Sequence, residues 1–127
     1  MMSYQLGTRS LQNLSGVNPD MVAVVKAAIK ITEQDFVVIE GIRNINRQRE
    51  LFKAGKSKTM NSRHITGHAV DLCPYPVDWD DHSKFEAIAE AMKAAAEDLG
   101  IPLEWGGDWK NGWDKPHYQL PHKDYPA

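Results

Sequence analysis

The sequence predicts one α+β domain, built from a small, mostly antiparallel sheet with helices packed on it. Its length of 127 residues is typical of a single domain and leaves too little chain for a second one. The composition, 42% hydrophobic and 25% charged, is that of an ordinary globular protein. Helical and strand-like patterns follow one another in the order α, α, β, α, β, α, β, β, and this order favours the α+β class.

Two helices are expected at the N-terminal end. Thr8 can cap a short helix that runs through Leu14 and places Leu11 and Leu14 on its inner face. Asn18 followed by proline is a favourable start for a second helix, which should continue to about Ile31. The apolar residues of this helix recur at the three- and four-residue spacing of a buried face: Met21, Val24, Val25, Ala28 and Ile29.

The middle of the chain is expected to form, in order, a strand over 35–40, a helix over 44–54, an exposed loop over 55–63 and a strand over 69–73. The first strand is short, β-branched and bounded by polar residues. Gly55 ends the helix in the way that glycine commonly does. Pro74 stops the second strand, because proline cannot donate a backbone hydrogen bond to a sheet.

The clearest helical pattern lies over 83–99. Its apolar side chains fall on one stripe: Phe85, Ile88, Ala89, Met92, Ala95, Ala96 and Leu99. Gly100 and Pro102 end this helix. Two short strands are expected after it, over 103–105 and 117–120, separated by a turn rich in glycine and tryptophan.

Charge and cysteine content exclude several classes of protein. The formal net charge of −2 argues against a dedicated nucleic-acid binder, which is usually strongly basic. A single cysteine, Cys73, leaves no intrachain disulfide framework and no multi-cysteine zinc site. No apolar stretch approaches the ~20 residues of a membrane span. The N-terminus lacks the basic and apolar pattern of a secretory signal, so we expect a protein made in the cytoplasm.

Charged residues are unevenly distributed along the chain. Residues 43–63 hold seven basic side chains against one acidic side chain, whereas residues 78–98 hold seven acidic against two basic. Such runs usually form solvated faces. The alternative is that residues 43–63 form a basic rim that attracts an anionic substrate.

Two segments with histidine and aspartate carry the strongest indication of chemistry. His64 and Asp71 lie seven residues apart around a glycine turn, and Asp114 precedes His117 by three residues. A catalytic zinc ion typically takes three protein ligands from histidine and carboxylate side chains, and His64, Asp71 and His117 supply that number. Asp114 then remains as a carboxylate that takes a proton from metal-bound water. From spacing alone, ordinary hydrogen-bonded histidines remain an alternative.

The motifs themselves resemble those of a known family. Residues 62–71, Ser-x-His-x-x-Gly-x-Ala-x-Asp, resemble the signature of the D-alanyl-D-alanine carboxypeptidase-like zinc peptidases. Residues 114–117, Asp-x-Pro-His, are similar to the second signature of that family, and residues 41–43, Gly-Ile-Arg, are similar to its Gly-x-Arg element. Residues 105–109 and 116–119 most resemble the L-alanyl-D-glutamate endopeptidase branch, which includes bacteriophage endolysins. The resemblance implies a fold of the Hedgehog and DD-peptidase type.

The resemblance also implies a zinc site with one catalytic carboxylate. Its Zn²⁺ ligands would be His64, Asp71 and His117. Asp114 would take the proton from zinc-bound water and later give it to the leaving amine. His68 lies an odd number of residues from Asp71 on a strand, so its side chain should point to the opposite face, and we do not expect it to be a ligand.

Several further residues have two possible roles each. Arg43 matches the family's arginine that stabilises negative charge on the scissile carbonyl oxygen, and the alternative is an ordinary salt bridge to Glu40 or Glu50. Ser62 would either bind substrate or order the loop that follows it. Three aromatic side chains would form either a wall of the substrate site or part of the core: Trp105, Trp109 and Trp113.

The sequence thus predicts a zinc metallopeptidase, an endolysin that hydrolyses peptidoglycan stem peptides between L-alanine and D-glutamate. The alternatives are a D-alanyl-D-alanine dipeptidase or carboxypeptidase and, from another class, a non-catalytic wall- or metal-binding module. We expect a monomer whose single domain, residues 1–127, has no separate wall-binding module. It would bind peptidoglycan and no nucleic acid. It would be made in the host cytoplasm and need a separate holin-type protein to reach the wall in the periplasm.

Overall fold

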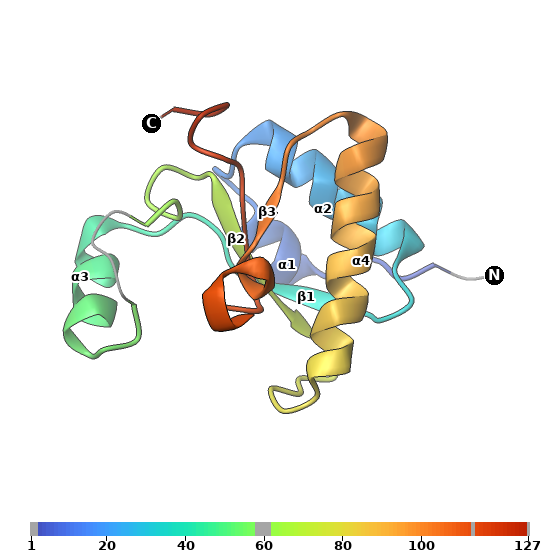
Figure 1. The fold of residues 1–127 in the computed structure, drawn as a ribbon, viewed down its shortest axis with the longest axis horizontal. Helices are drawn as coiled ribbons and strands as arrows, with labels where there is room; N and C mark the ends of the chain where they lie inside the picture. Colours follow the sequence, from blue (N-terminus) through green and yellow to red (C-terminus); the bar gives the residue numbers. More distant parts are fainter. Residues whose placement is uncertain (1–2, 58–61, 113, 127) are drawn as a thin grey trace.

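The computed structural model describes residues 3–57, 62–112 and 114–126 (Figure 1). In these residues the α-helices are α1 (Thr8–Asn13), α2 (Pro19–Ile31), α3 (Ile45–Lys53) and α4 (His82–Leu99). The strands are β1 (Phe36–Glu40), β2 (Ala69–Pro74), β3 (Glu104–Trp105) and β4 (His117–Gln119). Two short 3-10 turns, η1 (Gly106–Asp108) and η2 (Lys110–Gly112), lie between β3 and β4. This is the order of elements that the sequence predicts, with every boundary within one residue.

The four strands form one antiparallel sheet in the order β1-β2-β4-β3, so the α+β prediction is confirmed. Across β1, β2 and β4 the register places Asp71 opposite Glu40 on one side and opposite His117 on the other. At the far edge, Gln119 of β4 lies opposite Glu104 of β3. Polar residues of β1, β2 and β4 are therefore neighbours in the middle of the sheet, and those of β4 and β3 are neighbours at one edge.

One face of the sheet packs against α2 and α4 and forms the core. Side chains alternate between the two faces of a strand, so every second residue of β1, β2 and β4 points into this core. The core side chains contributed by the sheet and its ends are Phe36, Val38, Val70, Leu72, Trp105, Tyr118 and Leu120. Figure 1 shows α2 and α4 together on one side of the sheet and α3 on the other side. The intervening residues of β2 and β4 lie on the opposite face of the sheet.

The position of α1 differs from the prediction. Thr8 is its first helical residue and no side chain caps the helix, while Leu11 is 47% exposed, so these two predictions were wrong. Leu14 is buried in the core, as predicted. The buried side of α1 instead carries Ser10, whose Oγ accepts a 3.0 Å hydrogen bond from Val38 N, and Asn13, which donates to Val38 O at 2.7 Å. Because β1 is an edge strand, these polar side chains cover its open backbone groups and decide which side of α1 faces inward.

The predicted ends of the longer helices are confirmed. Asn18 caps α2 by accepting a 2.9 Å hydrogen bond from Asp20 N. Gly100 ends α4 with a φ of 70°, which glycine adopts without strain. Leu99, expected on the buried stripe of α4, is 44% exposed and lies outside the core. Among the described residues, no helix combines the length and apolar character needed to span a bilayer.

Candidate metal centre and active site

The sheet brings together the three predicted metal ligands on the face opposite the core. Asp71 lies in the middle of β2, between two buried core residues, and His117 begins β4 directly opposite it. His64 comes from the turn before β2, where Gly67 adopts a φ of 78° and so lets the chain reverse toward the strand. The spacing of seven residues between His64 and Asp71 is the length of this turn and the strand entry.

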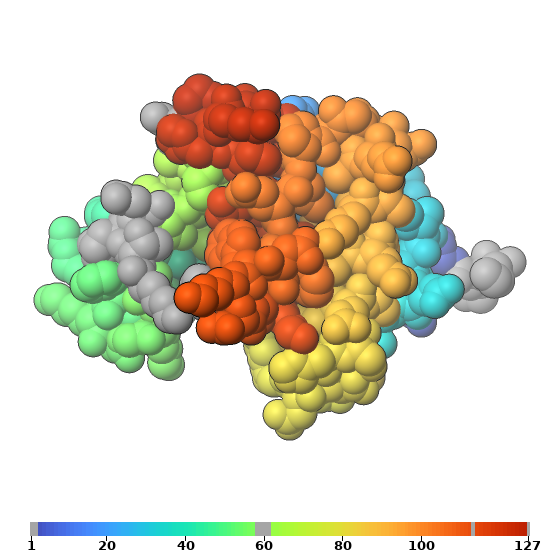
Figure 2. Space-filling view, in the orientation of Figure 1, coloured from blue at the N-terminus to red at the C-terminus, as the bar shows by residue number. Residues whose placement is uncertain are grey.

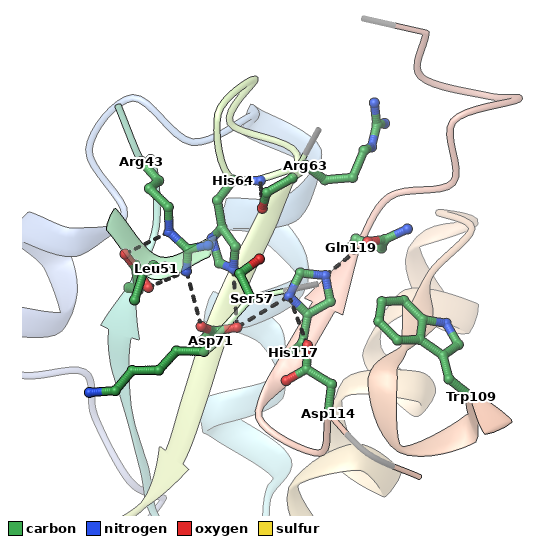
Figure 3. A pocket seen from close by; sticks show the side chains of 13 residues that line it. Arg43, Leu51, Ser57, Arg63, His64, Asp71, Trp109, Asp114, His117 and Gln119 are labelled. Atoms are coloured by element: carbon green, nitrogen blue, oxygen red, sulfur yellow. Dashed lines mark hydrogen bonds and ion pairs between the residues drawn. The ribbon is translucent and has the colours of Figure 1, made fainter. Parts of the chain in front are cut away.

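The three side chains form a tight cluster (Figure 3). His64 Nε2 lies 3.1 Å from Asp71 Oδ1, and His117 Nδ1 lies 3.2 Å from the same oxygen. One donor atom from each of the three residues lies within 4.8 Å of the others. Both imidazoles are buried, with side chains 2% and 7% exposed, whereas Asp71 is 16% exposed. The carboxylate of Asp71 is thus the most accessible part of the cluster.

The chemistry of the cluster fits a metal ion. His64 Nδ1 lies 2.8 Å from Gly41 O, and His117 Nε2 lies 2.8 Å from Gln119 Oε1. Carbonyl oxygens only accept hydrogen bonds, so in the neutral rings both outward nitrogens carry the hydrogen and both inward nitrogens keep a lone pair; only a protonated ring donates a hydrogen bond to Asp71. Two lone pairs and a carboxylate oxygen in contact repel one another unless a cation lies between them. Metal-ligating histidines are commonly anchored in this way through the second nitrogen.

The electrostatics of the cluster favour positive charge. Burial raises the pKa of Asp71, but hydrogen bonds from His117 and His64 outweigh it and hold that pKa well below its usual range. Burial lowers the pKa of His117, but the hydrogen bond and charge of Asp71 outweigh it and raise the pKa above its usual value. Asp71 is therefore ionised, and the site attracts a proton or a metal ion.

Asp114 lies beside the cluster without joining it. Its Oδ2 is 4.0 Å from His117 Nδ1, and its side chain is 26% exposed. Burial and the nearby charge of Asp71 raise the pKa of Asp114 above its usual value. The backbone of Asp114 packs directly on Gly106, where a Cβ atom would lie 2.0 Å from Asp114 O. Gly106 therefore permits the close approach that places this carboxylate next to the ligands.

Arg43 forms the salt bridge that the sequence offered as the alternative. Its Nε donates to Glu40 Oε1 at 2.9 Å, and its Nη2 also contacts Glu40. Nη1 donates to Gln48 Oε1 at 2.7 Å, and Nη2 lies 3.7 Å from Asp71 Oδ2. The guanidinium is thus fixed on two partners and faces the side of Asp71 that is turned away from the histidines.

These residues line a cavity of about 650 Å³. Its lining includes residues of α3, of the sheet and of the segment with η1 and η2. In the space-filling view α3 (green) lies on the left and the segment with η1 and η2 (orange) lies at the centre (Figure 2). The lining of the cavity comprises Glu40, Arg43, Leu51, Lys56, Ser57, Ser62, Arg63, His64, Asp71, Trp109, Asp114, His117 and Gln119. Ser62 lies in this lining, and its Oγ also accepts a 3.2 Å hydrogen bond from His64 N, so it orders the loop before that histidine.

The tryptophans divide between the core and the cavity. Trp105 is 8% exposed and stacks on Tyr118 with 6.4 Å between ring centroids, so it belongs to the core. Trp109 lines the cavity, with its ring 5.3 Å from that of His117. Trp113 lies outside the described residues.

Comparison with known proteins decides the family. A sequence model of the phage L-alanyl-D-glutamate peptidase family matches residues 2–122. The chain belongs to this family. It is 34% identical over 119 residues to the L-alanyl-D-glutamate peptidase of Escherichia phage T5, with 89% of this chain and 87% of that protein covered. The family prediction from the sequence motifs is confirmed, and so is the predicted class of peptidoglycan endopeptidase.

Solved structures confirm the fold of this peptidase family member. It is similar to the crystal structure of the L-Ala D-Glu endopeptidase ChiX of Serratia marcescens, with 46% identity, a TM-score of 0.90, and 97% of this chain and 95% of that chain covered. It also shares its fold with the vancomycin resistance D,D-dipeptidase VanXYg, at 17% identity and a TM-score of 0.53, with 86% of this chain and 53% of that chain covered. The DD-peptidase type of fold is therefore confirmed.

Some residues of the peptidase site were missed or left undecided by sequence reasoning. His68 is outside the cluster, as expected, and its Nδ1 lies 2.7 Å from Thr66 Oγ1. Gln119 was part of a recognised motif but received no role. Its position two residues after His117 on a strand was a usable signal, because such residues share a face. Glu40 was considered only as a partner of Arg43, although it also lines the cavity.

Proposed function

We propose that this chain hydrolyses peptidoglycan stem peptides between L-alanine and D-glutamate, with a zinc ion held by His64, Asp71 and His117. The observation that carries the proposal is the convergence of three donor atoms within 4.8 Å, with both outward histidine nitrogens anchored on carbonyl oxygens. A cluster of two histidines and one carboxylate is the ligand set of a catalytic zinc site. Family membership and the names of the relatives support the L-alanyl-D-glutamate bond as the target.

Three residues around the metal site have separate roles in the proposed reaction. When bound, zinc polarises the scissile carbonyl and lowers the pKa of water toward ~7. Asp114, ionised next to the ligands, takes the proton of the attacking water and gives it to the leaving amine. Arg43, which lines the cavity with its Nη2 3.7 Å from Asp71 Oδ2, would supply positive charge that stabilises the carbonyl oxygen as it becomes negative. Ser62 orders the loop of His64 and stands in the cavity wall.

Product analysis with and without metal tests this function. Purified stem peptides should be cut to give a new N-terminal D-glutamate, and a chelator should abolish the reaction until zinc is restored. Release of D-alanine would instead support the alternative D-alanyl-D-alanine dipeptidase or carboxypeptidase. Zinc binding without any cleavage of stem peptides would support the alternative of a non-catalytic wall- or metal-binding module.

We also propose that the protein acts as a monomeric endolysin with one catalytic domain and no wall-binding module in residues 1–127. Membership of a phage peptidase family supports a role in lysis. The proposed site of synthesis is the host cytoplasm, and the proposed site of action is the wall. A separate holin-type protein would open the way to the periplasm.

Zinc occupancy is expected to fall as the pH drops below about 6, because the ligand histidines must be neutral to bind metal. Below their pKa the histidines hold protons that compete with zinc, and Asp71 strengthens this competition at His117, whose pKa it raises. Occupancy should therefore rise with pH through the histidine range. The occupancy is measured as the zinc retained after dialysis at a series of pH values from 8 to 4.5, which span the pH range in which histidine titrates. Full occupancy at the acidic end would contradict histidine ligation.

Reversing positive charge at the end of α3 and in the loop that follows it is expected to weaken action on whole sacculi. Lys56 lines the cavity and Lys53 ends α3, both exposed, and stem peptides carry free carboxylates. The double variant Lys53→Glu/Lys56→Glu should raise KM for sacculi about 3- to 10-fold at low salt, and added salt should reduce the difference. The matched control is Lys26→Glu/Lys30→Glu on α2, which also reverses two exposed lysines. An equal effect of both pairs would contradict a specific role of the two lysines at and after the end of α3.

A further inference from the structure

We propose that Gln119 is a positioning residue that fixes the ring of His117 for metal binding, and that Glu104 in turn fixes the amide of Gln119. This inference rests on the proposed metal site. The relay consists of two hydrogen bonds: His117 Nε2 lies 2.8 Å from Gln119 Oε1, and Gln119 Nε2 donates to Glu104 Oε1 at 2.8 Å. It joins the buried cluster to the exposed edge of the sheet.

The sheet itself builds the relay. Gln119 follows His117 by two residues on β4, so both side chains point to the same face, away from the core. On β3, Glu104 is the direct cross-strand partner of Gln119. Side chains at directly opposed positions on one face lie close enough to interact. No loop needs to fold in a particular way for these three residues to meet.

The direction of the hydrogen bonds follows from the chemistry of the end residue. A carboxylate only accepts hydrogen bonds, so Glu104 draws the NH₂ group of the Gln119 amide toward itself. The amide oxygen must then face His117, and it accepts the hydrogen of Nε2. With the hydrogen held on Nε2, Nδ1 presents its lone pair toward Asp71, where it lies 3.2 Å from Oδ1. Glu104 thereby selects the metal-binding tautomer of His117 through one intermediate residue.

The two histidines of the cluster differ in how they are anchored. His64 relies on the backbone carbonyl of Gly41, which no side-chain substitution removes. His117 relies on the side chain of Gln119, which also lines the cavity. The anchor of His117 can thus be removed by changing one side chain that is not itself a ligand.

Zinc affinity of the purified protein, measured by competition with a chromophoric chelator, tests the relay. Gln119→Leu should weaken zinc binding by about 10- to 100-fold, the usual effect of removing such an outer partner. Gln119→Glu retains an oxygen acceptor for Nε2 and should bind zinc far more tightly than Gln119→Leu. Glu104→Ala should weaken binding when Gln119 is present and add nothing in the Gln119→Leu background. Gln12→Leu, an exposed glutamine on α1, is the matched control and should match the wild type.

The outcomes separate this inference from the proposed function. A wild-type protein that binds no zinc would overturn the metal site itself. Tight zinc binding by the wild type with unchanged affinity in Gln119→Leu would overturn the relay alone. Ring ¹⁵N chemical shifts of His117 in the metal-free protein should report hydrogen on Nε2 in the wild type and a mixture of tautomers in Gln119→Leu. Equal loss of affinity in the leucine and glutamate variants, with lower stability of both metal-free proteins, would indicate a purely structural role and also overturn the relay.

Discussion

Asp114→Asn is expected to lower kcat by about 10²- to 10⁴-fold while zinc stays bound, because general acid–base catalysis contributes about this much. The amide has nearly the same shape as the carboxylate but cannot take a proton from water. Asp114 lies outside the three-residue cluster, with its Oδ2 4.0 Å from His117 Nδ1, so the ligand atoms are left in place. Steady-state hydrolysis of a purified stem peptide and the zinc content of the same sample measure the two quantities.

The matched control for this variant is Asp108→Asn. Asp108 belongs to the same segment between β3 and β4, but its side chain is 56% exposed and pairs with Lys93 at 2.6 Å, away from the ligands. Its substitution should leave kcat within about twofold of the wild type, because exposed salt bridges contribute little. If Asp114→Asn retained most of the wild-type kcat with zinc bound, a different group would have to act as the base.

The sequence predicts the metal cluster because its members lie in short motifs with simple local geometry. Asp71 is flanked by residues that must enter the core, so strand alternation alone directs its side chain to the opposite face. Asp114 precedes His117 by one turn, and His117 N donates to Asp114 O at 3.1 Å, which brings the two side chains to the same side. Spacing within a turn or strand is visible in a sequence. The catalytic roles of these residues remain predictions until the variants are measured.

Contacts that depend on strand register could not be predicted in the same way. Glu40 lies opposite Asp71 only because β1 carries a register shift just before it. Glu104 meets Gln119 because a two-residue strand pairs with β4 at one particular offset. A shift of one residue would turn every side chain of the strand to the other face. That offset is set by the packing of the whole sheet, which the local sequence does not reveal.

The error at α1 has a related cause. Apolar periodicity predicted that Leu11 faces inward. In the structure the inner side of α1 instead carries polar side chains that form hydrogen bonds with the edge strand β1. Ser10 and Asn13 supply these hydrogen bonds to Val38 N and Val38 O. An unpaired buried backbone group costs about 1–3 kcal/mol, comparable to the gain from burying one apolar side chain. Hydrophobic patterns therefore predict poorly where a short helix covers a strand edge.

Gly41→Ala is expected to lower the free energy of unfolding by about 3 kcal/mol, at the upper end for overpacked sites, and to weaken zinc binding as well. A Cβ atom at Gly41 would lie 1.9 Å from Asn13 O and 2.9 Å from Val17 Cγ2. The first of these is a backbone atom at the end of α1, which cannot rotate away. The chain must therefore move, and with it Gly41 O, which lies 2.8 Å from His64 Nδ1. Urea unfolding and chelator competition measure the two effects.

Gly55→Ala separates the effect of the close approach from the general cost of replacing glycine. Gly55 has a φ of 74°, and within the described parts of the chain no atom lies within 4 Å of the place that a Cβ atom would take, so alanine meets only backbone strain there. That strain should cost about 1–2 kcal/mol and leave zinc affinity unchanged. Gly41 packs against the end of α1, and its carbonyl oxygen lies next to His64 Nδ1. Its substitution should therefore lower both the free energy of unfolding and the zinc affinity. A destabilised Gly41→Ala protein with wild-type zinc affinity would show that the position of this carbonyl is not what holds His64 in place.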